Sequence, residues 1–296
     1  MDLPQPPERP ALKPPTPRAV LAAALACAGA AAAAPPARHI DGIVWQPSRQ
    51  TLRPHGQWQR LGARHLLLQW AAVDGQSFFA DAGLPPIGPE LPDWQRIARE
   101  PWARDIVLGM AGLHDEAAAR ANARVLAAQS RALVLAAAPL PLRVSGWYFP
   151  VEIDPTWTPP ADWADALRLL PRPLWLSAHD SANLGPQPLA DWLARWLPPD
   201  VGVFFQDGVG VHARAPATAR AYLQHLSQRL SHPRVRAIAE AFRPAAGGGF
   251  RPATVAELLP QIDACQGWPT YLFDGPHYVS DALVDALHDA GVGVRD

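Results

Sequence analysis

Two glutamates follow largely apolar, strand-like stretches of the chain and could act together on one substrate. Glu152 comes directly after the aromatic-rich run 147–151, and Glu240 ends the run 235–240. Hydrolysis of a glycosidic bond uses such a pair, because one protonated carboxyl group protonates the leaving oxygen while an ionised one attacks or stabilises the sugar. The aromatic neighbours of Glu152 would raise its pKa, so we expect Glu152 to be the acid/base and Glu240 the nucleophile.

The two glutamates can meet only if the fold brings distant parts of the chain together. From residue 39 onward the sequence repeats a short apolar run, a polar or Gly/Pro-rich loop and an amphipathic helical run, and we count eight such units. The apolar runs are hydrophobic on both faces, which is typical of parallel strands in a buried sheet. Eight units over about 255 residues match a (β/α)8 barrel, so we expect one TIM-barrel domain over residues 39–296. The predicted strands are Ile40–Pro47, Arg64–Trp70, Asp105–Ala111, Val144–Ile153, Pro173–Ala178, Val201–Gln206, Val235–Ala241 and Thr270–Asp274.

An open, doubly wound sheet is the alternative architecture. Such a sheet usually has a Gly-rich turn after its first strand, whereas the corresponding loop here is Gln46–Gln50. The G-x-G-x-x-G motif does not occur anywhere in the chain. The sequence therefore favours the barrel.

The predicted helices carry recognisable start signals. Residues Ala117–Ala138 form the longest helical pattern. Thr254 and Glu257 have the spacing of a capping box, in which each side chain accepts a hydrogen bond from the other residue's backbone N–H. Thr218 and Ser280 are expected to cap two further helices through their hydroxyl groups.

The active site of a TIM barrel lies at the carboxyl ends of its strands, so the residues at the exits of the eight predicted strands form a ring. This ring is rich in carboxylates and amides. Asp207 is a third candidate catalytic carboxylate, or it caps the turn at residues 208–210 through its side chain. Aromatic rings suit the apolar faces of sugars, although they also build protein cores. The candidate substrate-binding residues are Trp45, Gln46, Gln69, Trp70, Trp147, Tyr148, His179, Asn183, Gln206, Asp274 and Tyr278.

Glutamates at the exits of the fourth and seventh strands resemble the large clan of retaining (β/α)8 glycoside hydrolases. The segments Gly42–Pro47, Leu67–Trp70, Gly146–Glu152 and Phe204–Val211 look like a bacterial barrel family known as a domain of unknown function and regarded as hydrolase-like. The resemblance covers about residues 39–290. It implies a retaining glycosidase that needs no cofactor and cleaves a bacterial polysaccharide or oligosaccharide. It also suggests exopolysaccharide as substrate and the exopolysaccharide assembly machinery as a possible partner.

The chain departs from the clan at one position. The clan places an asparagine directly before the acid glutamate, and Val151 stands there in this sequence. The contact that this asparagine makes with the sugar 2-hydroxyl would have to come from Asn183, Gln206 or His179.

Structural and binding roles are the first alternatives. Arg143, Arg214 and Arg243 are available as ion-pair partners for Glu152 and Glu240. A glutamate at a strand end is often such a partner rather than a catalyst. The whole barrel could also bind saccharides without cleaving them, because fold does not dictate function.

Metal-assisted hydrolysis is a further alternative. His39, Asp41, His179 and Asp274 fall near predicted strand ends, loosely as in metal-dependent barrel hydrolases. That chemistry uses a paired H-x-H on the first strand and commonly a lysine on the fourth, and neither is present here. We therefore expect no metal and no cofactor.

The composition excludes several other classes of function. Lys and Arg number 26 against 27 Asp and Glu, and a net charge of -1 gives no basic surface for a nucleic acid backbone. Lys13 is the only lysine, so the folded part has none for a Schiff base or a P-loop. Cys27 and Cys265 are the only cysteines, so a chain that has lost its N-terminal segment could form no internal disulfide.

The N-terminal segment has the pattern of an export signal. Residues 1–18 are Pro-rich with three basic residues, and residues 19–34 are an Ala/Leu run that ends in alanines. This order is typical of a secretory signal peptide, and the run is too short for a comfortable membrane span. We therefore expect residues 1–38 to be a removed signal or a disordered tail, and the mature protein to be periplasmic or secreted without a membrane span. Lipidation at Cys27 is less favoured, because a small residue stands where leucine is usual.

Overall fold

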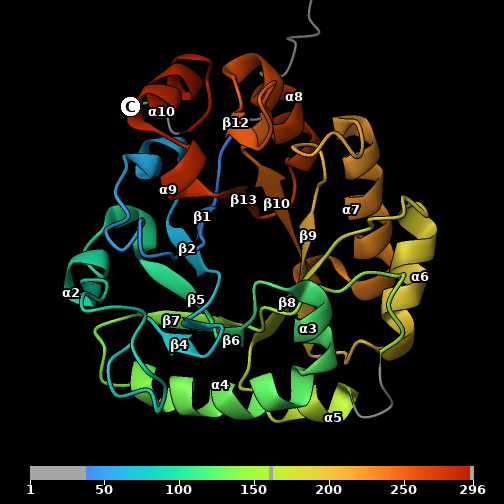
Figure 1. Cartoon of the computed structure of the whole chain (residues 1–296). Helices are drawn as coiled ribbons and strands as arrows, with labels where there is room; N and C mark the ends of the chain where they lie inside the picture. Colours follow the sequence, from blue (N-terminus) through green and yellow to red (C-terminus); the bar gives the residue numbers. More distant parts are fainter. Residues whose placement is uncertain (1–37, 160–162, 294–296) are drawn as a thin grey trace, which may run out of the picture. The chain divides into compact units, whose positions relative to one another are not determined.

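The computed structural model describes residues 38–159 and 163–293, which form a closed barrel of eight parallel strands (Figure 1). The predicted (β/α)8 fold is therefore confirmed. Of the predicted export segment 1–38 only Arg38 lies among the described residues, where its Nη2 donates to Asp263 Oδ2 at 2.9 Å. No helix in these two stretches is long and apolar enough to cross a membrane.

The eight strands lie where the sequence predicts them. Each barrel strand pairs in parallel with the next one along the chain, and the last pairs with the first to close the ring. Closure leaves no exposed sheet edge within the barrel. The strands are β1 (Gly42–Trp45), β2 (His65–Leu68), β5 (Asp105–Gly109), β7 (Val144–Tyr148), β8 (Leu174–Ala178), β9 (Val201–Gln206), β10 (Val235–Glu240) and β13 (Thr270–Phe273).

Helices surround the ring of strands, with the long ones on its outside (Figure 1). Each long helix buries an apolar stripe and leaves its polar face to solvent, as an amphipathic helix does. The α-helices are α2 (Trp94–Ile97), α3 (Glu116–Ala121), α4 (Ala123–Ala137), α5 (Trp163–Arg168), α6 (Pro186–Trp196), α7 (Pro216–Leu230), α8 (Val255–Cys265), α9 (Gly275–Tyr278) and α10 (Asp281–Asp289). The short 3-10 helices are η1 (Trp58–Leu61), η2 (Pro101–Ala103) and η3 (His232–Arg234).

The fourth barrel strand is shorter than predicted. β7 ends at Tyr148 rather than at Ile153. Pro150 has no N–H group to continue the strand pairing, and the chain beyond it runs as a loop. Only Ile153 pairs again, through a single bridge to Ala178. Glu152 therefore lies in the loop after the strand and not at the strand end.

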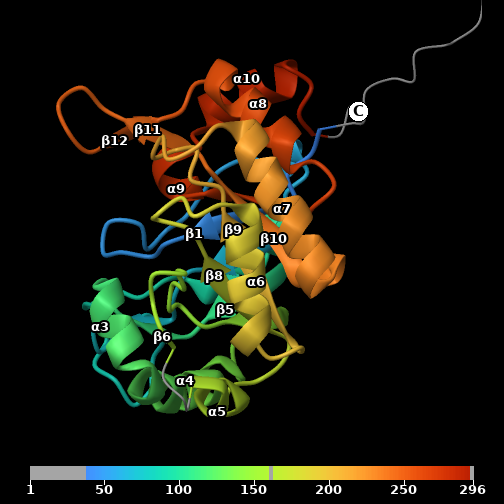
Figure 2. The same cartoon turned by 90° about the vertical axis from the view of Figure 1, so that its right-hand side faces the viewer.

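The helix predicted over Ala117–Ala138 is two helices, α3 and α4, which divide at Asn122. The Asn122 side chain donates to the Ala118 carbonyl oxygen at 2.8 Å and its backbone leaves the helical region. Asparagine competes in this way with the helical hydrogen bonds. The break gives α3 a direction of its own, on the side of the barrel where the strands end (Figure 2).

Two of the three predicted caps are confirmed. Ser280 Oγ accepts from Leu283 N at 3.3 Å, and both halves of the capping box at Thr254 are present. The cap predicted at Thr218 is wrong, because α7 already begins at Pro216. Proline suits the first helical position, where no N–H group is needed.

Alternation along the strands divides the buried side chains into two sets. One set points outward and packs against the helices, and the other fills the barrel. Gly42 and Gly202 leave the space that the Tyr271 and Trp175 rings occupy. The Arg236 guanidinium carbon lies 3.8 Å from the centroid of the Trp175 ring, which is a close cation–π contact. The inner set is Val44, Leu67, Val107, Tyr148, Trp175, Phe204, Ile238 and Tyr271.

Two small sheets stand beside the carboxyl ends of the barrel strands. β3 (Ala72–Val73), β4 (Gln76–Ser77) and β6 (Ala111–Gly112) form the first. β11 (Phe242–Pro244) and β12 (Phe250–Pro252) form a hairpin that projects on the same side as α3 (Figure 2). These additions, together with α3, build walls around the mouth of the barrel.

Replacing Gly202 with alanine should destabilise the barrel, because the new Cβ would lie 2.3 Å from a ring atom of Trp175. Overpacking of this kind costs about 1–3 kcal/mol, so we expect the melting temperature to fall by several degrees. Gly247→Ala is the control, since no atom lies within 4 Å of a Cβ there. Equal melting temperatures for both variants, measured by calorimetry, would contradict the packing described.

Candidate active site

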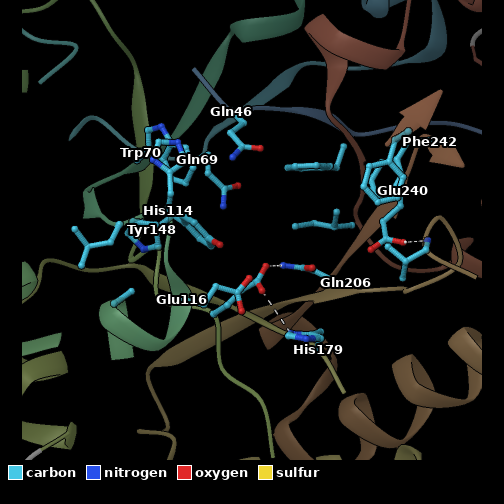
Figure 3. A pocket seen from close by; sticks show the side chains of 18 residues that line it. Gln46, Gln69, Trp70, His114, Glu116, Tyr148, His179, Gln206, Glu240 and Phe242 are labelled. Carbon is cyan, nitrogen blue, oxygen red and sulfur yellow. Dashed lines mark hydrogen bonds and ion pairs between the residues drawn. The ribbon is translucent and has the colours of Figure 1, made fainter. Parts of the chain in front are cut away.

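The alternation that fills the barrel with apolar side chains also brings polar ones to its mouth. Four strands have a residue with an amide or carboxyl side chain two positions after an inward-facing apolar residue, either on the strand or just beyond it, and both therefore point inward. These polar residues are Gln46, Gln69, Gln206 and Glu240. Together with the loops above them they enclose a cavity of about 390 Å³ (Figure 3).

The cavity gathers most of the predicted site. Figure 3 shows Gln46, Gln69 and Trp70 on one side and Glu240 and Phe242 on the facing side. The predicted site residues that line it are Gln46, Gln69, Trp70, Tyr148, Glu152, His179, Gln206 and Glu240. The lining residues outside the predicted set are Leu113, His114, Glu116, Ala119, Pro150, Val211, Ile238, Phe242, Phe250 and Phe273.

Six predicted site residues do not line the cavity: Trp45, Trp147, Asn183, Asp207, Asp274 and Tyr278. Trp45 and Trp147 occupy outward-facing strand positions and pack in the outer core. Asn183 Oδ1 accepts from Arg214 Nη2 at 3.0 Å. The placement of these six does not support direct contact with a sugar in this cavity.

Two of the six residues lie outside the cavity and contact residues that line it. Asp274 Oδ2 accepts from the backbone N–H of Gln46 at 3.3 Å and lies 2.7 Å from His277 Nδ1. The Tyr278 ring packs against Phe242, with ring centroids 5.2 Å apart. Both residues therefore hold wall residues in place.

Glu152 reaches the cavity from the loop that follows β7. Its Oε1 accepts a hydrogen bond from Gln206 Nε2, and its backbone carbonyl accepts from Arg120 Nε at 2.8 Å. His179 Nδ1 lies 3.5 Å from Oε2 of the same carboxyl group. The carboxyl group of Glu152 is thus surrounded by groups that can donate to it.

Glu116 is a functional candidate outside the set predicted from the sequence. It is the first residue of α3, lines the cavity and forms a carboxyl–carboxyl hydrogen bond with Glu152. This contact, with burial and the charge of Glu152, raises the pKa of Glu116 to about 8. Its position after the third predicted strand indicates that Glu116 lies near the mouth of the barrel. The sequence does not indicate that it contacts Glu152, which follows a different strand.

Glu240 ends β10 and is only 7% exposed. Burial and the nearby charge of Asp207 raise the pKa of Glu240 to about 7, against the opposing effect of the backbone N–H groups of Val211 and Gly210. The Val211 N–H lies 3.1 Å from Oε2 of Glu240. The carboxyl group is therefore oriented by the loop after β9 and holds its proton more firmly than an exposed glutamate.

Asp207 lies behind Glu240, because it is an outward-facing residue directly after β9. Its carboxylate is fully buried and accepts from Gln261 Nε2 at 2.6 Å and from Val209 N at 3.1 Å. The second bond is the turn-capping contact that the sequence suggested as an alternative role. Burial raises the pKa of Asp207 to about 6.

His179 stands between two carboxylates. Its Nδ1 is 3.5 Å from Glu152 and its Nε2 is 3.5 Å from Asp154 Oδ2. Burial lowers the pKa of His179, so the ring is neutral at pH 7. For Asp154 burial acts to raise the pKa, but hydrogen bonds from Thr156 and Ser181 outweigh it and lower the pKa to about 2.

The three arginines that could have paired with the two glutamates bind elsewhere. Arg143 Nε lies 2.9 Å from Asp105 Oδ1. Arg214 Nη2 donates to a backbone carbonyl of the neighbouring loop at 2.6 Å, and Arg243 donates to the backbone carbonyls of residues 240 and 242. None of these contacts engages the carboxyl group of Glu152 or Glu240.

The residues of the metal-site alternative are not brought together. His39 and Asp41 precede β1, and Asp41 accepts from the backbone N–H of Thr270 at the start of β13. His179 and Asp274 follow β8 and β13 at the opposite end of the barrel. Across residues 38–159 and 163–293, no group of three or more His, Cys, Asp or Glu side chains is arranged to hold a metal ion.

Comparisons with known proteins agree with the fold. No protein-family model matches the sequence, and no curated protein matches it either. A protein from Bacteroides thetaiotaomicron VPI-5482, proposed to be an alpha-L-fucosidase, has a similar structure with a TM-score of 0.60 and 14% identity, over 86% of this chain and 92% of that one.

Two further solved structures are similar to this chain. A chitinase from Chromobacterium violaceum ATCC 12472 matches with a TM-score of 0.50 and 13% identity, over 86% of this chain and 100% of that one. The spore cortex-lytic enzyme SleL of Bacillus megaterium QM B1551 matches with a TM-score of 0.50 and 10% identity, over 88% of this chain and 76% of that one. At these identities the likeness shows the fold, and the fold resemblance to TIM-barrel glycosidases that the sequence suggested is confirmed.

Proposed function

We propose that this protein hydrolyses a glycosidic bond in a polysaccharide or oligosaccharide. The observation that carries the proposal is that Glu152 and Glu240, two of the three glutamates that line one cavity at the mouth of the barrel, lie in different electrostatic surroundings. A pair of carboxyl groups with separated pKa values is the requirement of this reaction. The fold likeness to proteins described as a chitinase and a cortex-lytic enzyme agrees with the proposal.

The surroundings favour roles opposite to those that the sequence predicted. Glu240 is buried beside Asp207 and its pKa is raised, so it suits the proton donor. Glu152 accepts from Gln206 and suits the ionised partner, which acts as nucleophile or as base. The retaining outcome stays a prediction, and NMR of the first anomer released would test it.

The cavity walls suit a sugar. Amide groups of Gln46 and Gln69 can bind hydroxyl groups from one side, and aromatic rings of Phe242 and Phe250 offer apolar surface on the other. Phe250 is half exposed on the hairpin, with its ring centroid 4.6 Å from that of Phe242. Pockets that combine a few polar groups with aromatic walls are typical of small-molecule and saccharide sites.

A panel of bacterial polysaccharides and oligosaccharides, incubated with the purified protein, tests the function directly. The expected result is release of reducing ends from at least one member. Activity that a chelator abolishes and zinc restores would favour the metal alternative instead.

Glu152→Gln and Glu240→Gln should each lower kcat on that substrate by at least about 100-fold, because each removes a group that transfers a proton or bonds to the sugar. Both variants should still bind the saccharide, since Gln keeps the shape of the side chain. Glu90→Gln is the control, as Glu90 is exposed and pairs with Arg53. Unchanged turnover in Glu240→Gln would leave the barrel without its proposed acid.

The pH dependence distinguishes the two role assignments. A proton donor with a pKa of about 7 is active below that pH, so kcat/KM should fall as pH rises above about 7. If Glu240 were the ionised nucleophile, kcat/KM would instead rise through the same range. Initial rates at low substrate concentration from pH 5 to 9 decide between these outcomes.

We also propose export to the periplasm or the medium, on the basis of the N-terminal pattern. The mass of the protein recovered from the periplasm should correspond to a chain that starts near Pro35, because signal peptidase removes such segments after small residues. Recovery of chains that still begin at Met1 from that compartment would count against cleavage. The proposed exopolysaccharide substrate and assembly machinery depend on this localisation.

A further inference from the structure

We propose that Glu116 is a positioning residue for Glu152: the two carboxyl groups hold one proton between them, and Glu116 donates it so that Glu152 faces the cavity ionised. The catalytic consequence rests on the proposed function. The shared proton itself is a property of the protein without substrate, so it can be tested separately.

The carboxyl groups of Glu116 and Glu152 are in side-chain contact, and further interactions hold the helix and the loop that carry them. Asp115 Oδ1 accepts from Ala118 N at 2.7 Å and caps α3, which holds Glu116 at the first helical position. Arg120, one turn further along α3, donates to the Glu152 backbone carbonyl at 2.8 Å and lies 3.4 Å from Glu116 Oε2. One arginine therefore connects the helix to the loop that carries Glu152.

The charged groups around the pair do not neutralise two carboxylates. Arg120 contacts the pair as a cation, and it is shared with the Glu152 backbone. His179 is neutral at pH 7 because burial lowers its pKa, and it also faces the ionised Asp154. His114, near the start of α3, is held by Asp74 with 2.6 Å between Nδ1 and Oδ2.

Two ionised carboxylates at hydrogen-bond distance repel strongly, so such a pair keeps one proton over a wide pH range. The raised pKa of Glu116, about 8, agrees with a proton held there. Gln206 donates to Oε1 of Glu152 in the same arrangement. Glu152 then accepts from two donors, Gln206 and Glu116.

Proton titration of the resting protein tests the shared proton. The wild type should release about one proton per chain around pH 8 that Glu116→Gln does not release. Glu152→Gln should also lack this step, because without the partner charge Glu116 loses its proton at lower pH. Glu90→Gln should titrate like the wild type in this range. If the curves of Glu116→Gln and the wild type superimpose, the proposal is overturned.

Thermal stability gives a second readout with a defined sign. The folded-state pKa of Glu116 lies above its ordinary value of 4.5, so the folded protein binds more protons between pH 4.5 and about 8. The wild type should therefore lose stability relative to Glu116→Gln as pH rises through this window, and the difference should level off above it. A melting-temperature difference that does not change with pH would contradict a shared proton.

Activity then links the pair to catalysis. The Gln side chain can still donate to Glu152, so Glu116→Gln should keep kcat/KM within a few-fold of the wild type at pH 6. Glu116→Ala removes the donor and should lose at least tenfold at the same pH. Equal activity of both variants would show that Glu116 does not position Glu152. If the titration behaves as expected and no glycan is cleaved, the shared proton stands and the proposed function fails.

Discussion

Closure of eight parallel strands is the constraint on which the site depends. Once the ring is closed, every strand residue points either into the barrel or toward the helices, and the side chains alternate. The inward positions hold apolar side chains, both aliphatic and aromatic, in the middle of the barrel and Gln46, Gln69, Gln206 and Glu240 at its mouth. The same alternation sends Trp45 into the outer core. The strand residues that line the cavity are therefore determined by the alternation of side chains along each strand.

The carboxyl groups of the cavity differ because their neighbours differ. Glu240 is buried and backed by Asp207, which favours its protonated form. Glu152 sits on a loop between donors, and its nearest acid is Glu116 at the start of a short helix. Burial and pairing thus give acids of the same residue type different surroundings within one cavity.

Much of this arrangement could be predicted from the sequence. The repeated strand and helix pattern gives the barrel, and the residues after its strands include Glu152, Gln206 and Glu240. Which side chains point into the barrel could not be predicted, because the strand runs are apolar on both faces, and the sequence therefore did not distinguish the outward-facing Trp45 and Trp147 from inward-facing residues. The role of Glu116 could not be predicted, because it depends on tertiary contacts. Its partner lies on the loop after a different strand, and a break at Asn122 orients its helix. Pro150, which prevents β7 from continuing, is evident in the sequence, but its effect on the position of Glu152 depends on the path of the loop in the folded chain.

The aromatic layer beneath the cavity determines from which side a ligand can enter and leave. Trp175, Phe204 and Tyr271 fill the barrel, and Arg236 covers the Trp175 ring, so the cavity has a solid floor. A polymer cannot be threaded through the ring of strands. Whatever binds at Glu240 therefore enters and departs on the side of the barrel where the hairpin that carries Phe250 projects.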